Sequence, residues 1–147
     1  MTEMAGGCAC GAVRYTVEVA SPDAYLCHCR MCQKATGSVS IAFVDANQAD
    51  VTWESGPDWY VSSPIAKRPY CAQCGTSLGF QFAEGSVNMD LTVASFDDPA
   101  FFRCTSHFGT ESRLDVWWHG LEGLPENPTT DNAKLMAKWE AAGVQPG

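Results

Sequence analysis

Three groups of cysteines carry the chemistry that the sequence suggests. Cys8 and Cys10 form a C-x-C pair, and Cys71 and Cys74 form a C-x-x-C pair followed by Gly75. Two cysteine pairs from distant parts of a chain are typical of a closed, tetrahedral zinc site with a structural role. We therefore predict a Cys₄ zinc site that joins the first turn of the chain to a later hairpin.

The third group is the C-x-C-x-x-C sequence of Cys27, Cys29 and Cys32. Three sulfurs so close in sequence can bind one metal ion, and three protein ligands leave the fourth position for water or substrate, as in catalytic zinc sites. Arg30 and Lys34 flank this group, and their charge favours the thiolate form of the cysteines. The predicted cofactors are two zinc ions per chain, one structural and one catalytic.

Other interpretations of the cysteines stay open. The even number of cysteines, eight, also fits a disulfide framework. Cys104 or a histidine would close the three-cysteine group and give two inert zinc sites. The same group is also a candidate thiol redox site. Cys104 lies alone in an apolar stretch, where a cysteine is most often a small buried residue.

Two of the three histidines lie near the predicted metal site. His28 stands between two ligands, so its ring should point away from the metal, either into a pocket wall or to the surface. His107 ends a predicted strand and is a candidate proton carrier facing the open zinc site, because histidine titrates near neutral pH. A structural histidine bonded to the backbone is the alternative for His107. His119 has no specific predicted role.

The length and the charge limit the possible functions. A chain of 147 residues is expected to form one domain. Its 17 acidic and 9 basic residues give a formal charge of −8, which argues against nucleic acid or an anionic membrane as the main partner. The strongly apolar stretch 41–44 is too short to span a membrane. The first residues lack the basic start and apolar region of a signal peptide, so we expect a cytoplasmic protein.

An anionic ligand would therefore need local basic groups rather than the overall field of the protein. Arg30, Lys34, Lys67 and Arg68 are the candidates, and an exposed surface position is the default expectation for each of them.

Alternating apolar residues predict a mainly β fold with little helix. A tight turn is expected at 6–11, and strands are expected at 11–19, 38–45, 51–53, 59–61, 77–82, 86–93, 101–108 and 116–118. A short helical turn should follow Cys29. A C-terminal helix should be capped by Thr130 or Asp131 and end at Gly143.

The cysteine pattern, together with Gly7, Gly11, Val13-Arg14-Tyr15, His28, Gly75, His107-Phe108 and Trp117, resembles the glutathione-dependent formaldehyde-activating enzyme family. The eukaryotic relatives of that family include centromere protein V. The resemblance extends over roughly residues 6–118 and includes all seven clustered cysteines.

The resemblance implies a zinc-stapled β-tent of antiparallel sheets, which we place over residues 1–123. The linker and short helix of 124–147 lie outside the resemblance, and we expect them to pack on this domain as a covering element. It implies structural zinc at Cys8, Cys10, Cys71 and Cys74 and catalytic zinc at Cys27, Cys29 and Cys32. The implied activity is that of a carbon–sulfur lyase acting on the adduct of a small-molecule thiol, glutathione, with formaldehyde or another small carbonyl. A non-catalytic, zinc-stabilised binding module is the alternative, because a fold does not by itself fix a function.

Overall fold

The computed structural model describes residues 1–144. It contains one compact unit over Met1–Leu114 and a second that begins at Asp115. The predicted boundary lay a few residues later, after residue 123. The packing of the C-terminal segment on the β domain stays a prediction.

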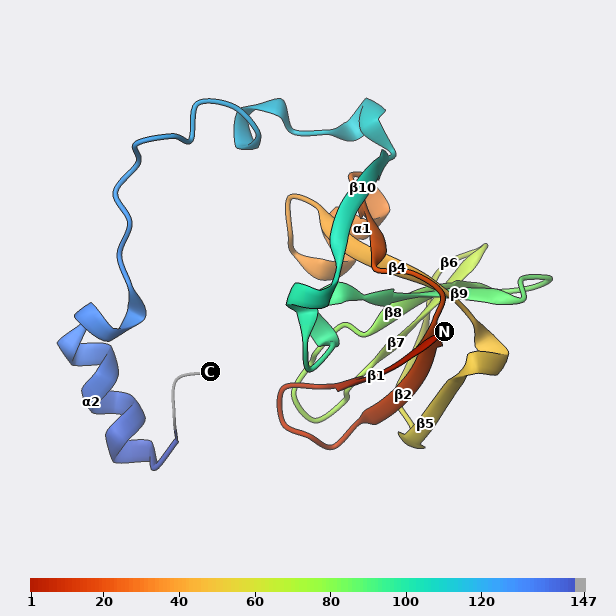
Figure 1. The fold of residues 1–147 in the computed structure, drawn as a ribbon, viewed down its shortest axis with the longest axis horizontal. Helices are drawn as coiled ribbons and strands as arrows, with labels where there is room; N and C mark the ends of the chain where they lie inside the picture. Colours follow the sequence, from red (N-terminus) through yellow and green to blue (C-terminus); the bar gives the residue numbers. More distant parts are fainter. Residues whose placement is uncertain (145–147) are drawn as a thin grey trace. The chain divides into compact units, whose positions relative to one another are not determined.

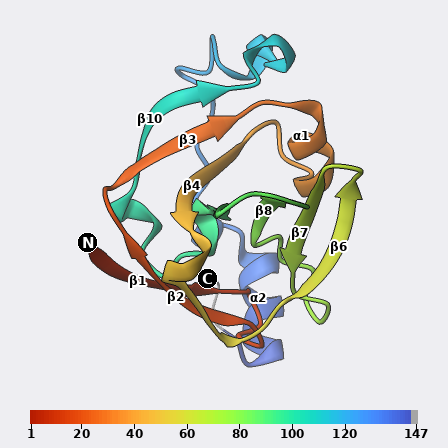
Figure 2. The ribbon, with the colours of Figure 1, turned by 90° about the vertical axis from the view of Figure 1, so that its right-hand side faces the viewer.

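Two β-sheets build the first unit (Figure 1). The smaller sheet has three strands in the order β1 (Thr2–Gly7), β2 (Arg14–Val19) and β5 (Val51–Ser55). The larger sheet has seven strands in the order β10 (Arg103–Phe108), β3 (Asp23–Cys27), β4 (Ile41–Asn47), β9 (Asn88–Thr92), β8 (Gly79–Phe82), β7 (Ala66–Tyr70) and β6 (Asp58–Ser63). The helix α1 (Arg30–Thr36) follows β3 directly (Figure 2).

Apolar side chains from both sheets form the main core. β2 alternates between buried and partly buried positions, and it buries Tyr15, Val17 and Val19, as the sequence predicts. The larger sheet contributes Ala24, Val44, Ala46, Met89 and Leu91 to the same cluster. The alternation of side chains along a strand places the neighbouring residues on the other face of the sheet.

That other face carries a second, smaller apolar cluster. Cys27, Cys32 and Phe43 are its buried members, with Tyr25, Cys29, Ile41 and Phe80 packed against them. The larger sheet is therefore covered on one face by the core and holds the three-cysteine group on the other.

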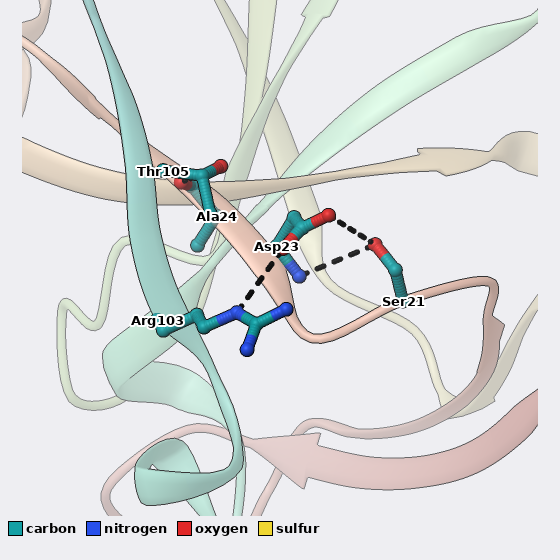
Figure 3. A network of polar contacts seen from close by, with 5 residues as sticks. All are labelled: Ser21, Asp23, Ala24, Arg103 and Thr105. Carbon is teal, nitrogen blue, oxygen red and sulfur yellow. Dashed lines mark hydrogen bonds and ion pairs between the residues drawn. The ribbon is translucent and has the colours of Figure 1, made fainter.

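One strand pairing differs from the expected antiparallel arrangement, because β10 runs parallel to β3. Figure 3 shows the start of this pairing, where Arg103 forms an ion pair with Asp23 at 3.3 Å and Thr105 donates to the carbonyl oxygen of Ala24. The parallel register places His107 beside Leu26 and Phe108 beside Cys27. It brings the end of β10 to the three-cysteine group.

The prediction of a mainly β fold with a short C-terminal helix is confirmed. Seven of the eight predicted strands are present, with ends shifted by a few residues. The strand predicted at 116–118 is wrong, because Asp115–Trp117 forms a 3₁₀ turn. The sequence analysis missed β3 and β7, and it described Gly6 and Gly7 as a turn although they end β1.

The second unit contains the helix α2 (Ala133–Ala142). Asn132 caps α2 by accepting a hydrogen bond from the amide of Leu135, so the cap lies one residue beyond the predicted Asp131. Gly143 ends the helix with φ +68°, as predicted. Among residues 1–144, no helix is both long and apolar enough to cross a membrane.

Candidate metal centres and the cavity beside them

The first cysteine group joins two distant turns. The sulfurs of Cys8, Cys10, Cys71 and Cys74 all lie within 4.8 Å of one another. Sγ of Cys10 lies 3.5 Å from Sγ of Cys8 and 3.8 Å from Sγ of Cys71. A zinc ion with four sulfurs at about 2.3 Å in a tetrahedron separates them by about 3.8 Å, so this cluster fits the ion.

Backbone and hydroxyl groups surround these sulfurs. The amide of Val13 donates to Sγ of Cys8 at 3.2 Å, and the hydroxyl of Thr76 lies 3.1 Å from Sγ of Cys74. The contact with Thr76 is the main reason that the pKa of Cys74 is lowered to about 5. Cys74 is therefore held readily as a thiolate, the form that binds metal, whereas its neighbours raise the pKa of Cys10 to about 12.

The second cysteine group lies at the junction of β3 and α1. The sulfurs of Cys27, Cys29 and Cys32 lie within 4.8 Å of one another, and no fourth donor among residues 1–144 joins them. Cys29 is the N-cap of α1, where its sulfur accepts from the amide of Cys32 at 3.4 Å. Both clusters could hold a metal ion, and the second would leave one coordination position for an external ligand.

Arg68 supports this group from β7. It is completely buried, and its Nη2 donates to Sγ of Cys32 at 3.3 Å. The guanidinium also lies over the ring of Phe80, 4.9 Å from its centroid. The expectation of an exposed position for Arg68 is wrong, because β7 turns this side chain into the protein rather than towards solvent.

The pKa values of Cys27 and Cys32 shift in opposite directions. The pKa of Cys32 is lowered to about 5, first by its hydrogen bond with Cys27 and then by Arg68. The same hydrogen bond and burial raise the pKa of Cys27. Of these two sulfurs, Cys32 therefore carries the negative charge more readily.

A cavity of about 540 Å³ opens beside the three cysteines. Its walls are mostly aromatic and aliphatic, and its polar lining residues include Asp90, Ser106 and His107. The aromatic and aliphatic lining residues are Tyr25, Met31, Phe43, Ile65, Phe80, Phe82 and Phe108. A cysteine group that could hold a metal ion, in the wall of an apolar cavity with few polar side chains, is a typical arrangement for a small-molecule site.

The two histidines meet at the end of β10. Nε2 of His28 lies 2.9 Å from Nδ1 of His107, and His107 lines the cavity. His28 is completely buried, so its surface alternative is wrong. The amide of His28 donates to the carbonyl of Phe108.

Gly109 follows Phe108 and lies close to the three-cysteine group. Its φ is +65°, and a Cβ atom there would lie 2.9 Å from the amide nitrogen of Cys29, so only glycine allows this close approach.

Two polar residues in the cavity were missed by the sequence analysis. The hydroxyl of Tyr25 donates to Oδ1 of Asp90 at 2.9 Å. Burial raises the pKa of Asp90 to about 6 and also raises the pKa of Tyr25. Asp90 occupies a polar position in an alternating strand, which in sequence is indistinguishable from a solvent-facing residue.

Arg30 and Lys34, both on α1, line a second cavity of about 550 Å³. Met31 lines both cavities. Nη1 of Arg30 donates to Oε1 of Gln33 at 2.8 Å, which fixes the guanidinium at the wall. These two basic residues therefore lie next to the cysteine-lined cavity.

Cys104 lies outside both clusters. It is exposed on β10, so the expectation of a buried residue is wrong. The reason is that β10 is the edge strand of the larger sheet. All eight cysteines are free thiols, which does not agree with a disulfide framework.

Comparisons with known proteins point to one family. The family model described as glutathione-dependent formaldehyde-activating enzyme matches residues 3–112. An uncharacterized lyase of Schizosaccharomyces pombe is 32% identical over 85 residues, which make up 58% of this chain and 62% of that protein. The match therefore spans less than two thirds of this relative. A crystal structure of a Rhodobacter sphaeroides protein is similar with a TM-score of 0.54 and 26% identity, over 64% of this chain and 88% of that one.

Proposed function

Because this chain belongs to the glutathione-dependent formaldehyde-activating enzyme family, we propose that it is a lyase-like enzyme acting on the adduct of glutathione, or a similar thiol, with formaldehyde or a small carbonyl. One observation carries the proposal: three cysteine sulfurs, without a fourth protein donor among residues 1–144, line a cavity large enough for a small molecule. The lyase name of the yeast relative agrees with this reaction class.

The two cysteine clusters have different roles in this proposal. Cys8, Cys10, Cys71 and Cys74 hold a structural zinc ion, and Cys27, Cys29 and Cys32 hold a catalytic one. A zinc ion bound at the second cluster would supply a Lewis acid and would lower the pKa of an incoming thiol. Arg68 offsets part of the negative charge that three thiolates bring into the interior.

The reaction joins a thiol and a carbonyl: the S–H bond breaks, a C–S bond forms, and the carbonyl oxygen gains a proton. The proton of the thiol needs an acceptor in the cavity. His107 lines the cavity, and an imidazole can take up and release a proton near neutral pH. Its contact with His28 fixes the orientation of the ring. We assign to His107 the exchange of this proton.

Arg30 and Lys34 are assigned to the recognition of the thiol. Glutathione carries two carboxylates, for which arginine and lysine are the usual partners. Both side chains line the cavity that adjoins the cysteine-lined one. A thiol bound at the three-cysteine group would have its carboxylates within reach of α1.

We also propose that the protein acts in the cytoplasm without nucleic acid or membrane partners. The support is chemical: all eight cysteines are free, and clustered free cysteines that bind metal are typical of reducing compartments. The net charge of −8 disfavours nucleic acid.

Calorimetric titration of the zinc-loaded protein with glutathione tests the proposal. We expect binding at micromolar to low millimolar concentration that is lost in Cys29→Ser. Cys104→Ser is the matched control, because it removes an exposed cysteine outside both clusters, and it should bind normally. No heat of binding up to several millimolar, with two zinc ions per chain, would contradict the proposal and favour a non-catalytic binding module.

A further inference from the structure

The carboxyl group of Asp90 lies in the wall of the same cavity as the three cysteine sulfurs. Asp90 is on β9, in register with Phe80 of β8 and Asp45 of β4. Directly paired residues share one face of a sheet, so Asp90 is on the face that carries the three-cysteine group.

The Asp90 carboxyl group is partly buried and has few polar partners. Asp90 forms no ion pair with another residue of 1–144. Tyr25 donates to Oδ1, which leaves Oδ2 for a ligand. A carboxylate that is partly withdrawn from water is costly unless it is paired. A carboxyl group that faces a cavity with a single hydrogen bond and no ion pair is a candidate for a functional role.

Asp90 is not placed as a metal ligand. The donors that lie within 4.8 Å of one another at this site are the three sulfurs alone among residues 1–144. The carboxyl group therefore lines the cavity of the three sulfurs without belonging to their group.

We propose that Asp90 is a further catalytic residue, which binds the oxygen of the carbonyl or hydroxymethyl group and exchanges a proton with it. This inference rests on the proposed function. In the direction of addition, the C–S bond forms and the π electron pair of C=O moves to oxygen. That oxygen takes the proton of the Asp90 carboxyl group, while the thiol proton passes to His107. Solvent returns one proton from His107 to Asp90, so the sum is thiol plus carbonyl to adduct.

The protonation of Asp90 agrees with this role. Burial is the main cause that raises its pKa to about 6, and the charges of Asp45 and Cys32 add to the effect, whereas Tyr25 and Arg68 oppose it. A group with a pKa near the working pH is suited to give and take a proton in each turnover.

The assignment is tested by the rate at which a ¹³C label exchanges between formaldehyde and S-hydroxymethylglutathione, which exchange NMR measures. We expect the zinc-loaded wild-type protein to accelerate the exchange and Asp90→Asn to lower the acceleration by about 100-fold or more. Asp50→Asn is the control, because it removes an exposed carboxylate that does not line the cavity. It should keep the wild-type rate.

Zinc content and glutathione affinity should be unchanged in Asp90→Asn, which separates a role in proton transfer from a role in holding metal or thiol. Tyr25→Phe is a second variant that retains the carboxyl group. We expect it to shift the acidic limb of the pH–rate profile, because it removes the hydrogen bond to Oδ1.

The outcomes separate the two proposals. If the wild-type protein does not accelerate the exchange, the proposed function fails and the role of Asp90 fails with it. If the wild-type protein accelerates the exchange and Asp90→Asn does so equally, the role of Asp90 alone is overturned. If Asp90→Asn does not fold, an unchanged rate and pH profile in Tyr25→Phe would overturn it.

Discussion

Nη2 of Arg68 donates a hydrogen bond to the sulfur of Cys32 over 3.3 Å in the interior of the protein. The two residues come from β7 and α1, which are distant in sequence. A zinc ion with three thiolates carries a net charge of −1, and a buried arginine beside it restores neutrality. Because an unpaired charge in the interior is costly, Arg68 and the three-cysteine metal site should depend on each other.

Arg68→Met should therefore lower the metal affinity of the second cluster. We expect the purified variant to retain about one zinc ion per chain instead of two, with Arg68→Lys intermediate because it keeps the charge but not the planar group. Metal analysis of the dialysed proteins measures this. The control is Arg103→Met, which removes an exposed cation that pairs with Asp23. Two zinc ions in Arg68→Met after dialysis would contradict the dependence.

Loss of each metal site should have a different effect. Structural zinc contributes on the order of 10 kcal/mol in small zinc domains, so Cys71→Ser should lower the melting temperature by about 10 °C or more. Cys29→Ser should lower it much less, while abolishing thiol binding. Thermal unfolding and calorimetry of both variants distinguish the roles. Equal loss of stability in both would mean that both sites are structural.

The basic residues of α1 should matter for charged thiols only. Arg30→Ala and Lys34→Ala should each weaken glutathione binding by about 3- to 10-fold, because each removes one partner of a carboxylate at a solvent-accessible site. Neither should change the binding of 2-mercaptoethanol, which has no carboxylate. The two titrations at low and high salt measure this. A similar loss for both thiols would show that α1 acts only on the shape of the metal site.

His107 should act on the rate rather than on binding. It is exposed at the end of β10, so His107→Gln should fold normally. Loss of a positioned acid–base group typically lowers the rate by about 10²–10⁴-fold, and glutathione affinity should change little. His119→Gln is the control, since this histidine lies in the second compact unit. Wild-type turnover in His107→Gln would exclude it as the proton carrier.

Asp90 should make the protein less stable as the pH rises. Its folded-state pKa, about 6, lies above the ordinary value of 3.8, so the native state holds the proton more tightly than the unfolded state. Ionisation of Asp90 therefore lowers the free energy of unfolding. This loss is absent below pH 3.8, grows as the pH rises to about 6, and persists at higher pH. Asp90→Asn should remove this loss. Chemical unfolding between pH 4 and 7 should show the variant gaining stability relative to the wild-type protein.

Asp97 should change the stability with pH in the opposite direction from Asp90 in the same unfolding experiment. Its hydrogen bonds with Arg14 lower its pKa, so it contributes stability at neutral pH that is lost as the pH falls through its folded-state pKa. Asp97→Asn should therefore lose stability at pH 7 relative to pH 4, and only modestly, because the pair is half-exposed. Parallel curves for the two variants would contradict both assignments.

The strands that alternate clearly in sequence were predicted, and the others were missed for physical reasons. β2 buries every second side chain against the core, so its period of two is visible. β7 buries Ala66, Arg68 and Pro69, and an arginine and a proline do not resemble a buried strand in sequence. The parallel pairing of β10 with β3 could not be predicted, because strand register depends on contacts between distant segments.

The sequence by itself determined which cysteines could bind metal. The C-x-C, C-x-C-x-x-C and C-x-x-C spacings bring sulfurs together within single turns, so local geometry suffices to predict the three-cysteine group and each of the two pairs, whereas the tertiary structure joins the two pairs into one cluster. Only the tertiary structure decided what surrounds them. Arg68 of β7 contacts Cys32, while Tyr25 of β3 and Asp90 of β9 line the adjoining cavity. The burial of such side chains depends on which face of a folded sheet they occupy. A polar residue in a strand has the same local pattern whether it faces water or a buried cavity, and only the packing of distant strands separates the two.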